Sequence, residues 1–395
     1  MHPETSPITK VIDGSSDAEK RLFPAFSFVH PYQKRKSSHE PSNMRSRVVV
    51  RAVGAHTEGE EGEIIVGGIP HIAGSTMLER VRTMQKEHDW LRQLVLNEPR
   101  GKVNKNSNII VAPTSEGADF GLIILESVEY VPMSGSNTIC AITVALETGL
   151  VKMQEPVTNV LMDTVAGLVS AEAACDDGRC LSVKFTNVPA FVLALDAEVD
   201  VPGIGKLKVD IAWGGMIYAL VRIEEMPFKI DPQFGRELVQ TGELIKNCLR
   251  AQVAVSHPQI PSVSGVSNLE FIGPLSNDPR GGKVATNAVV VSPGRCDRSP
   301  CGTGTSARLA VLHARGLLDV GETFYHQSII GTEFTSKIES LTQVGSIPAV
   351  VPSIQGRAWI SSFHDYVIDP DDPFPNGFRV GDTWGPGPAD EIRLI

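Results

Sequence analysis

From residue 45 onward, short apolar runs alternate with polar positions and are separated by glycine, proline and asparagine. Runs such as RSRVVVRAVGA, NSNIIVAPT and FGLIILESVEYV are rich in β-branched residues and have the period of strands. A helical period interrupts them at residues 74–96, where apolar residues from Met77 to Trp90 recur at helical spacing and Ser75 can cap the first turn. The pattern predicts mainly antiparallel strands with few helices.

One segment of this pattern occurs twice. SGSNTICAITVALETGL (134–150) aligns without a gap on CGTGTSARLAVLHARGL (301–317), so that Ser134 falls on Cys301 and Gly135 on Gly302. Both copies consist of a glycine turn, an apolar helix and a glycine C-cap, and each follows a strand-rich segment. The repeat predicts an α+β fold of two pseudo-symmetric lobes, each a mainly antiparallel sheet around a central helix. Chance similarity of two glycine-capped helices is the alternative.

The predicted boundaries follow from the repeat. The first lobe spans 45–205 and carries the Ser134 turn, and the second spans 206–375 and carries the Cys301 turn. Residues 376–395 are expected to return to the first lobe. Residues 1–44 are polar and rich in serine and proline, which indicates a disordered extension.

Composition narrows the class of protein. The chain has 395 residues, 42% of them hydrophobic, which suffices for one large or two medium cores. Its net charge is −10, and no run of lysine and arginine stands on a helix beside aromatic residues, so we expect no nucleic-acid partner. No window is apolar enough to span a membrane, and no secretory signal stands at the N-terminus. The six cysteines lack the spacing of common zinc sites. We expect a cytoplasmic protein with free thiols and no metal.

Cys301 stands between a proline and a glycine-rich turn that opens into a helix. A helix N-terminus presents unpaired N–H groups and the positive end of the helix dipole, which favour thiolate over thiol. A buried structural cysteine is the alternative. If the two lobes face each other, Ser134 and Cys301 lie on opposite walls, and an anion between them meets N–H groups from both turns. The residues expected to supply these groups are Gly135, Ser136, Gly302 and Thr303.

Further segments carry a family resemblance. DRSPCGTGTSA (297–307), together with GAHTEGE, GGIPHIAGSTMLER, NEPRG, DIAWGGMIYALV and HQSIIGTEF, resembles the recurring motifs of the proline racemase superfamily. The resemblance implies a fold of the diaminopimelate-epimerase type with the active site between the lobes. It also implies proton transfer at the α-carbon of a small proline-like amino acid without a cofactor. Cys301 then matches a catalytic cysteine, Gly302 and Thr303 the amides that hold the substrate carboxylate, and Asp297 the partner of the ring nitrogen.

The first catalytic motif departs from the family pattern. Racemases usually have Cys-Gly-His where this chain has Ser134, Gly135 and Ser136. Because a serine hydroxyl is a far weaker base than a thiol, racemisation of proline itself is disfavoured. Dehydration of trans-3-hydroxy-L-proline to Δ1-pyrroline-2-carboxylate needs a proton-transfer group on only one side of the substrate ring. It is therefore the preferred hypothesis. The alternatives are 2-epimerisation of 3- or 4-hydroxyproline, both reactions together, or an amino-acid-binding protein without activity.

Five other residues are weaker candidates, each with a structural role as its alternative. His56 can line the cleft, and Trp213 can close over an apolar ring together with Tyr218. Asp210 and His326 can frame the site. The GTGT turn lacks the lysine of a phosphate loop, so no nucleotide is expected. A homodimer is possible.

Overall fold

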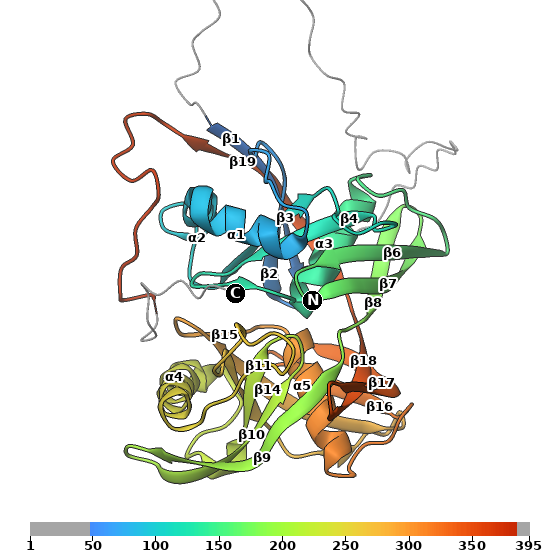
Figure 1. The fold of residues 1–395 in the computed structure, drawn as a ribbon, viewed down its shortest axis with the longest axis vertical. Coiled ribbons are helices and arrows are strands. Elements are labelled where there is room, and N and C mark those ends of the chain that lie inside the picture. Colours follow the sequence, from blue (N-terminus) through green and yellow to red (C-terminus); the bar gives the residue numbers. More distant parts are fainter. Residues whose placement is uncertain (1–47, 385–395) are drawn as a thin grey trace, which may run out of the picture. The chain divides into compact units, whose positions relative to one another are not determined.

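The two halves of the chain repeat one order of secondary-structure elements in the computed structural model, which describes residues 48–384 (Figure 1). The predicted extension 1–44 and residues 385–395 of the predicted C-terminal segment lie outside the described residues.

The first half contains helices α1 (Met77–Glu87), α2 (Asp89–Leu96) and α3 (Gly135–Glu147). Its strands are β1 (Val48–Thr57), β2 (Glu60–Gly67), β3 (Lys105–Val111), β4 (Phe120–Leu125), β5 (Tyr130–Val131), β6 (Val157–Thr164), β7 (Gly167–Asp176), β8 (Arg179–Thr186) and β9 (Ala190–Val201).

The second half contains helices α4 (Gly235–Gln252) and α5 (Gly302–Ala314) and the short 3-10 turns η1 (Ile223–Glu225) and η2 (Pro232–Phe234). Its strands are β10 (Gly205–Trp213), β11 (Ile217–Arg222), β12 (Asn268–Ile272), β13 (Ser276–Asn277), β14 (Lys283–Val291), β15 (Arg295–Cys296), β16 (Thr323–Gln327), β17 (Glu333–Val344), β18 (Ile347–Gly356) and β19 (Ala358–Ile368).

Strand pairing confirms the internal repeat. In the first half β2 is parallel to β3, β3 antiparallel to β4, and β4 parallel to β6. In the second half β11 is parallel to β12, β12 antiparallel to β14, and β14 parallel to β16. Helices α3 and α5 have 13 residues each and connect the last parallel pair of their halves. Gly149 and Gly316 follow them at φ values of 75° and 68°, as the predicted glycine caps require.

The final strand of each half joins the sheet of the other half. β9 pairs with β10, and β19 pairs with β1, both antiparallel. The predicted boundary between residues 205 and 206 therefore falls inside the β9–β10 hairpin. β19 (358–368) lies within the predicted second lobe, 206–375, but pairs with β1 of the first lobe. The apolar pattern marks a segment as a strand, but its partner is chosen by contacts between residues far apart in the sequence.

The N-terminal helical region also differs from the prediction. Residues 74–96 form two helices, because His88 leaves the helical conformation at φ −133°. Thr76, not Ser75, is the N-cap of α1 and accepts a hydrogen bond from the Glu79 amide. The amide and hydroxyl of Ser75 donate to the Glu79 carboxylate, which completes the reciprocal arrangement of a capping box.

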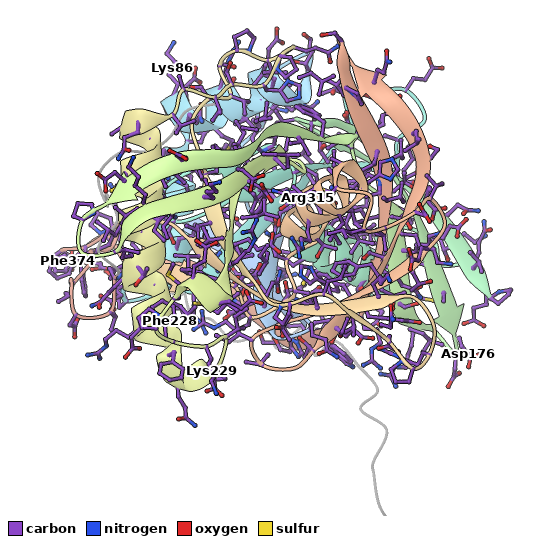
Figure 2. The ribbon with its side chains drawn as sticks, turned by 90° about the horizontal axis from the view of Figure 1, so that it is seen from below. Lys86, Asp176, Phe228, Lys229, Arg315 and Phe374 are labelled. Atoms are coloured by element: carbon purple, nitrogen blue, oxygen red, sulfur yellow. The ribbon has the colours of Figure 1, made fainter. Side chains whose placement is uncertain are left out.

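The central helices α3 and α5 are enclosed by the sheets. α3 is buried up to Leu146 and α5 up to Leu312, as a helix with apolar and small residues on all faces requires. Their side chains belong to one apolar core that includes Ile142, Phe185 and Leu309. Figure 2 shows the side chains packed around α5, with Arg315 at its C-terminal end.

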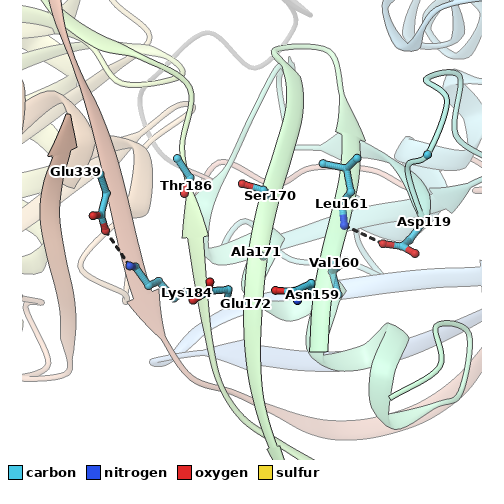
Figure 3. Close-up of a pocket in the computed structure, with 11 residues that line it drawn as sticks. Asp119, Asn159, Val160, Leu161, Ser170, Ala171, Glu172, Lys184, Thr186 and Glu339 are labelled. Atoms are coloured by element: carbon cyan, nitrogen blue, oxygen red, sulfur yellow. Dashed lines mark hydrogen bonds and ion pairs between the residues drawn. The ribbon is translucent and has the colours of Figure 1, made fainter. Parts of the chain in front are cut away.

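A groove of about 620 Å³ lies on the exposed face of β6, β7 and β8 (Figure 3). Its lining is mostly polar, and an ion pair of 2.8 Å between Lys184 and Glu339 crosses one edge. None of the residues predicted to act on a substrate lines this groove.

The meeting of α3 and α5 generates a prediction about stability. A Cβ atom on Gly135 would lie 2.6 Å from the Gly302 Cα atom, a separation that heavy atoms do not tolerate. We therefore expect Gly135→Ala to lower the free energy of unfolding by about 1–3 kcal/mol, the usual effect of overpacking. Urea denaturation followed by circular dichroism measures the change.

Gly235→Ala is the matched control, because Gly235 is also the first residue of a helix and has open space around it. This substitution should leave stability unchanged or raise it by less than about 1 kcal/mol. Equal stability of the two variants would contradict the close contact between α3 and α5.

Candidate active site between the two lobes

The structure brings the two predicted turns into direct contact. Ser134 is the N-cap residue of α3, and Cys301 occupies the same position in α5. The first residues of the two helices touch, since a Cβ atom on Gly302 would lie 2.7 Å from the Gly135 Cα atom. Two helix N-termini thus point toward one region, which favours a bound anion there.

The loop that leads into α5 is held in an unusual conformation. Cys301 has φ 62°, in the left-handed region that non-glycine residues rarely occupy. Its amide donates to the Ser299 hydroxyl at 3.1 Å, and the Ser299 amide and hydroxyl donate to Asp297 Oδ1 at 2.8 and 2.9 Å. Local hydrogen bonds therefore compensate the backbone strain and place the Asp297 carboxyl close to Cys301.

The thiol of Cys301 is buried, with 6% of the residue exposed. Its Sγ lies 3.3 Å from the Tyr218 hydroxyl and 3.9 Å from the Thr303 hydroxyl. Burial, and then the nearby Asp297, raise the pKa of the thiol well above its usual range, while the hydrogen bond from Tyr218 opposes them. The helix N-terminus, which by itself favours the thiolate, is outweighed in this environment by the cost of desolvating that charge.

Asp297 is also buried and lies in a negative environment. Burial and the charge of Glu60 raise the pKa of its carboxyl, against the opposing effect of Arg295. Asp297 therefore holds its proton more tightly than an exposed aspartate. A cation bound beside it would reverse that effect.

Ser134 has a different set of neighbours. Its Oγ accepts a hydrogen bond of 2.9 Å from Asn137 Nδ2, and Asn137 Oδ1 accepts one of 2.7 Å from Asn108. Within residues 48–384 no acid or imidazole contacts this hydroxyl, so its proton has no described base to receive it. The arrangement suits Ser134 to donate a proton rather than to remove one.

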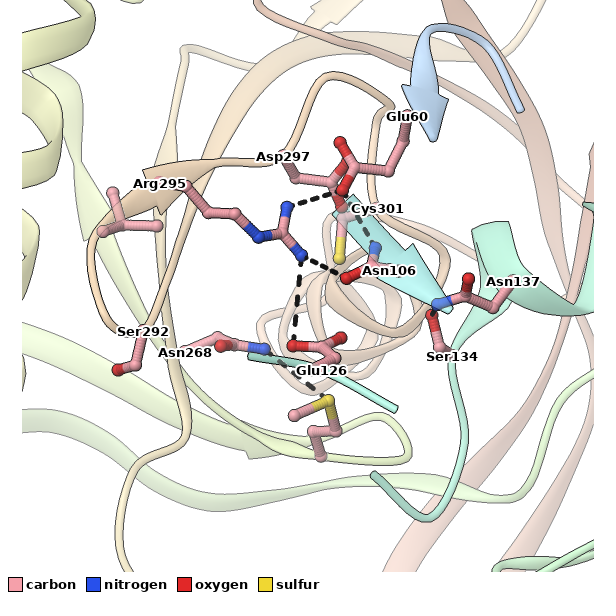
Figure 4. A network of polar contacts seen from close by, with 12 residues as sticks. Glu60, Asn106, Glu126, Ser134, Asn137, Asn268, Ser292, Arg295, Asp297 and Cys301 are labelled. Atoms are coloured by element: carbon pink, nitrogen blue, oxygen red, sulfur yellow. Dashed lines mark hydrogen bonds and ion pairs between the residues drawn. The ribbon is translucent and has the colours of Figure 1, made fainter. Parts of the chain in front are cut away.

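A buried ion pair between the lobes adjoins these residues (Figure 4). Arg295 from β15 donates to Glu60 of β2 at 2.5 Å and to Asn106 of β3 at 2.7 Å. The second oxygen of Glu60 accepts from the amide of Arg298 at 2.8 Å. Sequence reasoning missed this network, although Glu60 ends the GAHTEGE motif and Arg295 lies two positions before Asp297.

Two further buried carboxyls belong to the surroundings of the site. Glu126 lies 4.0 Å from Arg295, and burial raises its pKa to about 7. Glu270 on β12 accepts from Asn287 at 3.0 Å, and burial raises its pKa to about 7 as well. Figure 4 shows Arg295 between Glu60 and Glu126, with a dashed line to each carboxylate.

Several weaker candidates lie elsewhere. Asp210 pairs with Arg315 at 2.5 Å, at the opposite end of α5 from Cys301, so it does not frame the site. Trp213 packs in the second-lobe core, with its ring centroid 4.6 Å from that of His257. The ring of His56 stacks on Trp359 at 5.3 Å. These aromatic contacts give both residues structural roles.

His326 lies behind the site. Its Nδ1 is 2.8 Å from the Thr305 hydroxyl and its Nε2 is 3.5 Å from Glu270. Burial lowers the pKa of this fully buried imidazole well below its usual value, so the ring is neutral. Its described polar contacts join α5 to β12 and do not reach Cys301.

Two further observations concern residues 48–384. No cluster of three or more histidine, cysteine, aspartate or glutamate residues in that range has the arrangement of a metal site. No described helix is long and apolar enough to cross a membrane.

The structure thus brings two buried helix N-termini together, one with a cysteine and one with a serine at its N-cap, in a two-lobed α+β fold. The chain belongs to the proline racemase family, whose model matches residues 52–379. It is 41% identical over 351 residues to a 4-hydroxyproline 2-epimerase of Rhizobium etli, a match that covers 88% of this chain and all of that protein.

Solved structures agree with this assignment. A hydroxyproline epimerase from Agrobacterium vitis, with bound trans-4-hydroxy-L-proline, is 40% identical with a TM-score of 0.81, covering 87% of this chain and 98% of that one. A probable proline racemase from Agrobacterium radiobacter, with bound carbonate, is 40% identical with a TM-score of 0.80, covering 85% and 98%. The predicted family and the two-lobed fold are confirmed. The relatives favour the epimerase alternative, and dehydration stays unconfirmed.

The ion pair between the lobes leads to a prediction. Arg295→Met removes the cation and leaves Glu60 buried, so we expect the free energy of unfolding to fall by about 3–5 kcal/mol. Arg51→Met removes a pair with Asp365 whose side chains are 69% and 41% exposed, and it should cost less than about 1 kcal/mol. Urea denaturation measures both, and a similar small loss in both variants would contradict a buried Arg295–Glu60 pair.

Burial of Glu270 predicts a pH dependence of stability. The carboxyl has a pKa of 4.5 as its ordinary value and about 7 in the folded protein, so the folded state binds its proton more tightly. This contribution to stability is complete below the ordinary value and is lost as the pH rises through the folded value. Glu270→Gln has no group to titrate here, so its stability does not show this loss. As the pH rises across this interval, the free energy of unfolding of the wild type should fall relative to that of Glu270→Gln by up to about 1.4 kcal/mol per pH unit. Urea denaturation at several pH values tests this, and a pH-independent difference would contradict it.

Proposed function

We propose that this protein catalyses the 2-epimerisation of a 4-hydroxyproline by proton transfer at Cα, with Cys301 and Ser134 as the two proton-transfer groups. The carrying observation is that both residues occupy the N-cap position of a buried helix and that the two helices meet at Gly135 and Gly302. The relatives support the choice of substrate, because one is a 4-hydroxyproline 2-epimerase and another holds trans-4-hydroxy-L-proline.

The substrate carboxylate fits the point where the helices meet. We assign it to the N–H groups of the two first turns, from Gly135 and Ser136 on α3 and from Gly302 and Thr303 on α5. These groups are fixed before the substrate arrives, so they stabilise the negative charge that spreads onto the carboxylate when the α-proton leaves. No cofactor is needed for this step.

The substrate ammonium then activates the base. We assign the ring nitrogen to Asp297, whose negative charge is one cause of the raised pKa of Cys301. A cation bound to Asp297 compensates this charge and lowers the pKa of both groups. Cys301 thereby becomes a competent base only when the site is occupied.

Proton transfer completes the reaction. The Cys301 thiolate takes the α-proton, and the electron pair is delocalised into the carboxylate. The Ser134 hydroxyl delivers a proton to the opposite face, and the resulting alkoxide is stabilised by the Asn137 amide and the N-terminus of α3. Water then returns a proton to this alkoxide, and the hydroxide so formed takes the proton of the Cys301 thiol, which restores the thiolate. In the reverse direction the two groups exchange roles. Either face can carry the α-hydrogen of the L-isomer.

Dehydration of trans-3-hydroxy-L-proline is the second candidate. The observation that favours it is the missing base at Ser134, because elimination needs proton removal on one face only. A bifunctional enzyme would carry out both reactions from the same Cys301 step. A protein that only binds an amino acid would carry out neither.

One assay separates these possibilities. The wild type, Cys301→Ala and Ser134→Ala are incubated in D₂O with trans-4-hydroxy-L-proline and with trans-3-hydroxy-L-proline. NMR follows α-deuterium and the cis-4-hydroxy-D-proline product, and a coupled reductase detects Δ1-pyrroline-2-carboxylate. We expect the wild type to epimerise the 4-hydroxy isomer faster than it dehydrates the 3-hydroxy isomer. Each substitution should lower epimerisation by about 10² to 10⁴, the usual contribution of one general acid or base.

Other outcomes identify the alternatives. Faster formation of the pyrroline product, with full activity retained in Ser134→Ala, would make the protein a dehydratase. Absence of α-deuterium from both substrates would make it a binding protein. Retention of more than about a tenth of wild-type activity in Cys301→Ala would exclude Cys301 as the main base.

A further inference from the structure

The hydroxyl of Tyr218 makes three polar contacts inside the candidate site. Tyr218 is on β11, with 1% of the residue exposed. Its Oη lies 2.7 Å from the Thr303 hydroxyl, 3.2 Å from Asn268 Nδ2 and 3.3 Å from Cys301 Sγ.

The direction of these hydrogen bonds follows from the groups involved. Asn268 Nδ2 can only donate, so the phenol oxygen accepts there. The single phenol proton then has two acceptors, Thr303 Oγ1 and Cys301 Sγ. Burial keeps the pKa of Tyr218 well above its usual value, so the phenol retains this proton at neutral pH.

We infer that Tyr218 is a further catalytic residue, whose hydroxyl donates a hydrogen bond to the Cys301 thiolate during proton transfer at Cα. With the neutral thiol, the S–H donates to the phenol oxygen and the phenol donates to Thr303. When the thiolate forms, the phenol proton turns to Sγ and the Thr303 hydroxyl donates to the phenol oxygen. The number of hydrogen bonds is conserved, and no covalent bond to oxygen breaks.

The other charged groups around the thiol make this donor necessary. Asp297 faces the sulfur from the preceding loop and Glu270 faces it from β12, and both raise the pKa of Cys301. The Tyr218 hydroxyl and the amide of Gly304 favour the thiolate, and the Thr303 hydroxyl lies farther from the sulfur, at 3.9 Å. Without Tyr218, the nearer side-chain hydroxyl is lost while burial and two carboxyls still disfavour the thiolate.

Close packing fixes the phenol in place. A Cβ atom on Gly304 would lie 3.0 Å from Glu270 Oε2, 3.2 Å from Cys301 Sγ and 3.3 Å from Tyr218 Cε1. The sulfur, the carboxyl and the ring therefore crowd the same side of the first turn of α5. The tyrosine ring cannot move away from the sulfur without displacing these neighbours.

The test measures the thiolate directly. In the full-length protein, iodoacetamide alkylation of Cys301 is followed against pH by peptide mass spectrometry, and thiolate absorbance is titrated against a Cys301→Ser reference. Tyr218→Phe should move the pH midpoint upward by about one to two units, because a hydrogen bond to a charged group is lost. Site-directed replacement of Tyr218 by 3-fluorotyrosine strengthens the donor and should move the midpoint downward while the phenol is retained.

Tyr325→Phe is the control, since Tyr325 contacts Arg280 on another part of the second lobe and should leave the midpoint unchanged. An unchanged midpoint in Tyr218→Phe, or a fluorotyrosine shift in the same direction as the phenylalanine shift, would overturn the inference. If Tyr218→Phe does not fold, the sign of the fluorotyrosine shift decides.

The catalytic part of this inference rests on the proposed function, but the two can fail separately. Solvent exchange of the α-hydrogen in the wild type tests the function, and the Cys301 midpoint tests the hydrogen bond. If both hold, the acidic limb of the pH profile of kcat/KM for α-deuterium exchange moves with the Cys301 midpoint. Midpoint shifts in the protein without any exchange would refute the catalytic role and leave only a structural hydrogen bond.

Discussion

The contact between Gly135 and Gly302 is the constraint on which the rest of the candidate site depends. Each residue begins a central helix, and the approach of the two backbones leaves no room for a side chain at either position. Because the helices meet end to end, their unpaired N–H groups point toward one small region instead of two separate ones. Each half of the chain supplies one of these helices. The last strand of each half pairs with the first strand of the other half, β9 with β10 and β19 with β1, and these pairings hold the two halves together.

The electrostatics of the site are unbalanced without a ligand. Asp297 and Glu270 raise the pKa of Cys301, and the cation of Arg295 is already paired with Glu60. Desolvation disfavours every additional negative charge in such a place. In the proposed reaction a zwitterionic substrate compensates both charges, since its carboxylate is assigned to the helix N-termini and its ammonium to a buried carboxyl. This explains how a thiol with a raised pKa can act as the base of the proposed reaction only when the site is occupied.

The replacement of a cysteine by Ser134 makes the two walls chemically unequal. Cys301 has the Tyr218 hydroxyl at hydrogen-bond distance from its sulfur and a strained backbone, whereas Ser134 has a conventional extended N-cap geometry and accepts a hydrogen bond from Asn137. The relatives show that the family includes proteins described as epimerases with about 40% identity to this chain. The proposed reaction therefore relies on stabilisation of an alkoxide by Asn137 and the helix N-terminus. A thiolate at this position would need less stabilisation, because a thiol is more acidic than a serine hydroxyl.

The sequence by itself determined the strand-rich pattern, the repeated helix with its glycine caps, the equivalence of Ser134 and Cys301, and the family, because these are local features written in consecutive residues. Only the tertiary structure decided that β9 and β19 change lobes, that Asp210 lies at the far end of α5, and that Trp213 belongs to a core. It also decided the pKa of Cys301 and the Arg295–Glu60 pair, whose partners are 235 positions apart. The physical reason is that burial and charge pairing are properties of a neighbourhood assembled from distant segments, and no local pattern specifies which segments become neighbours.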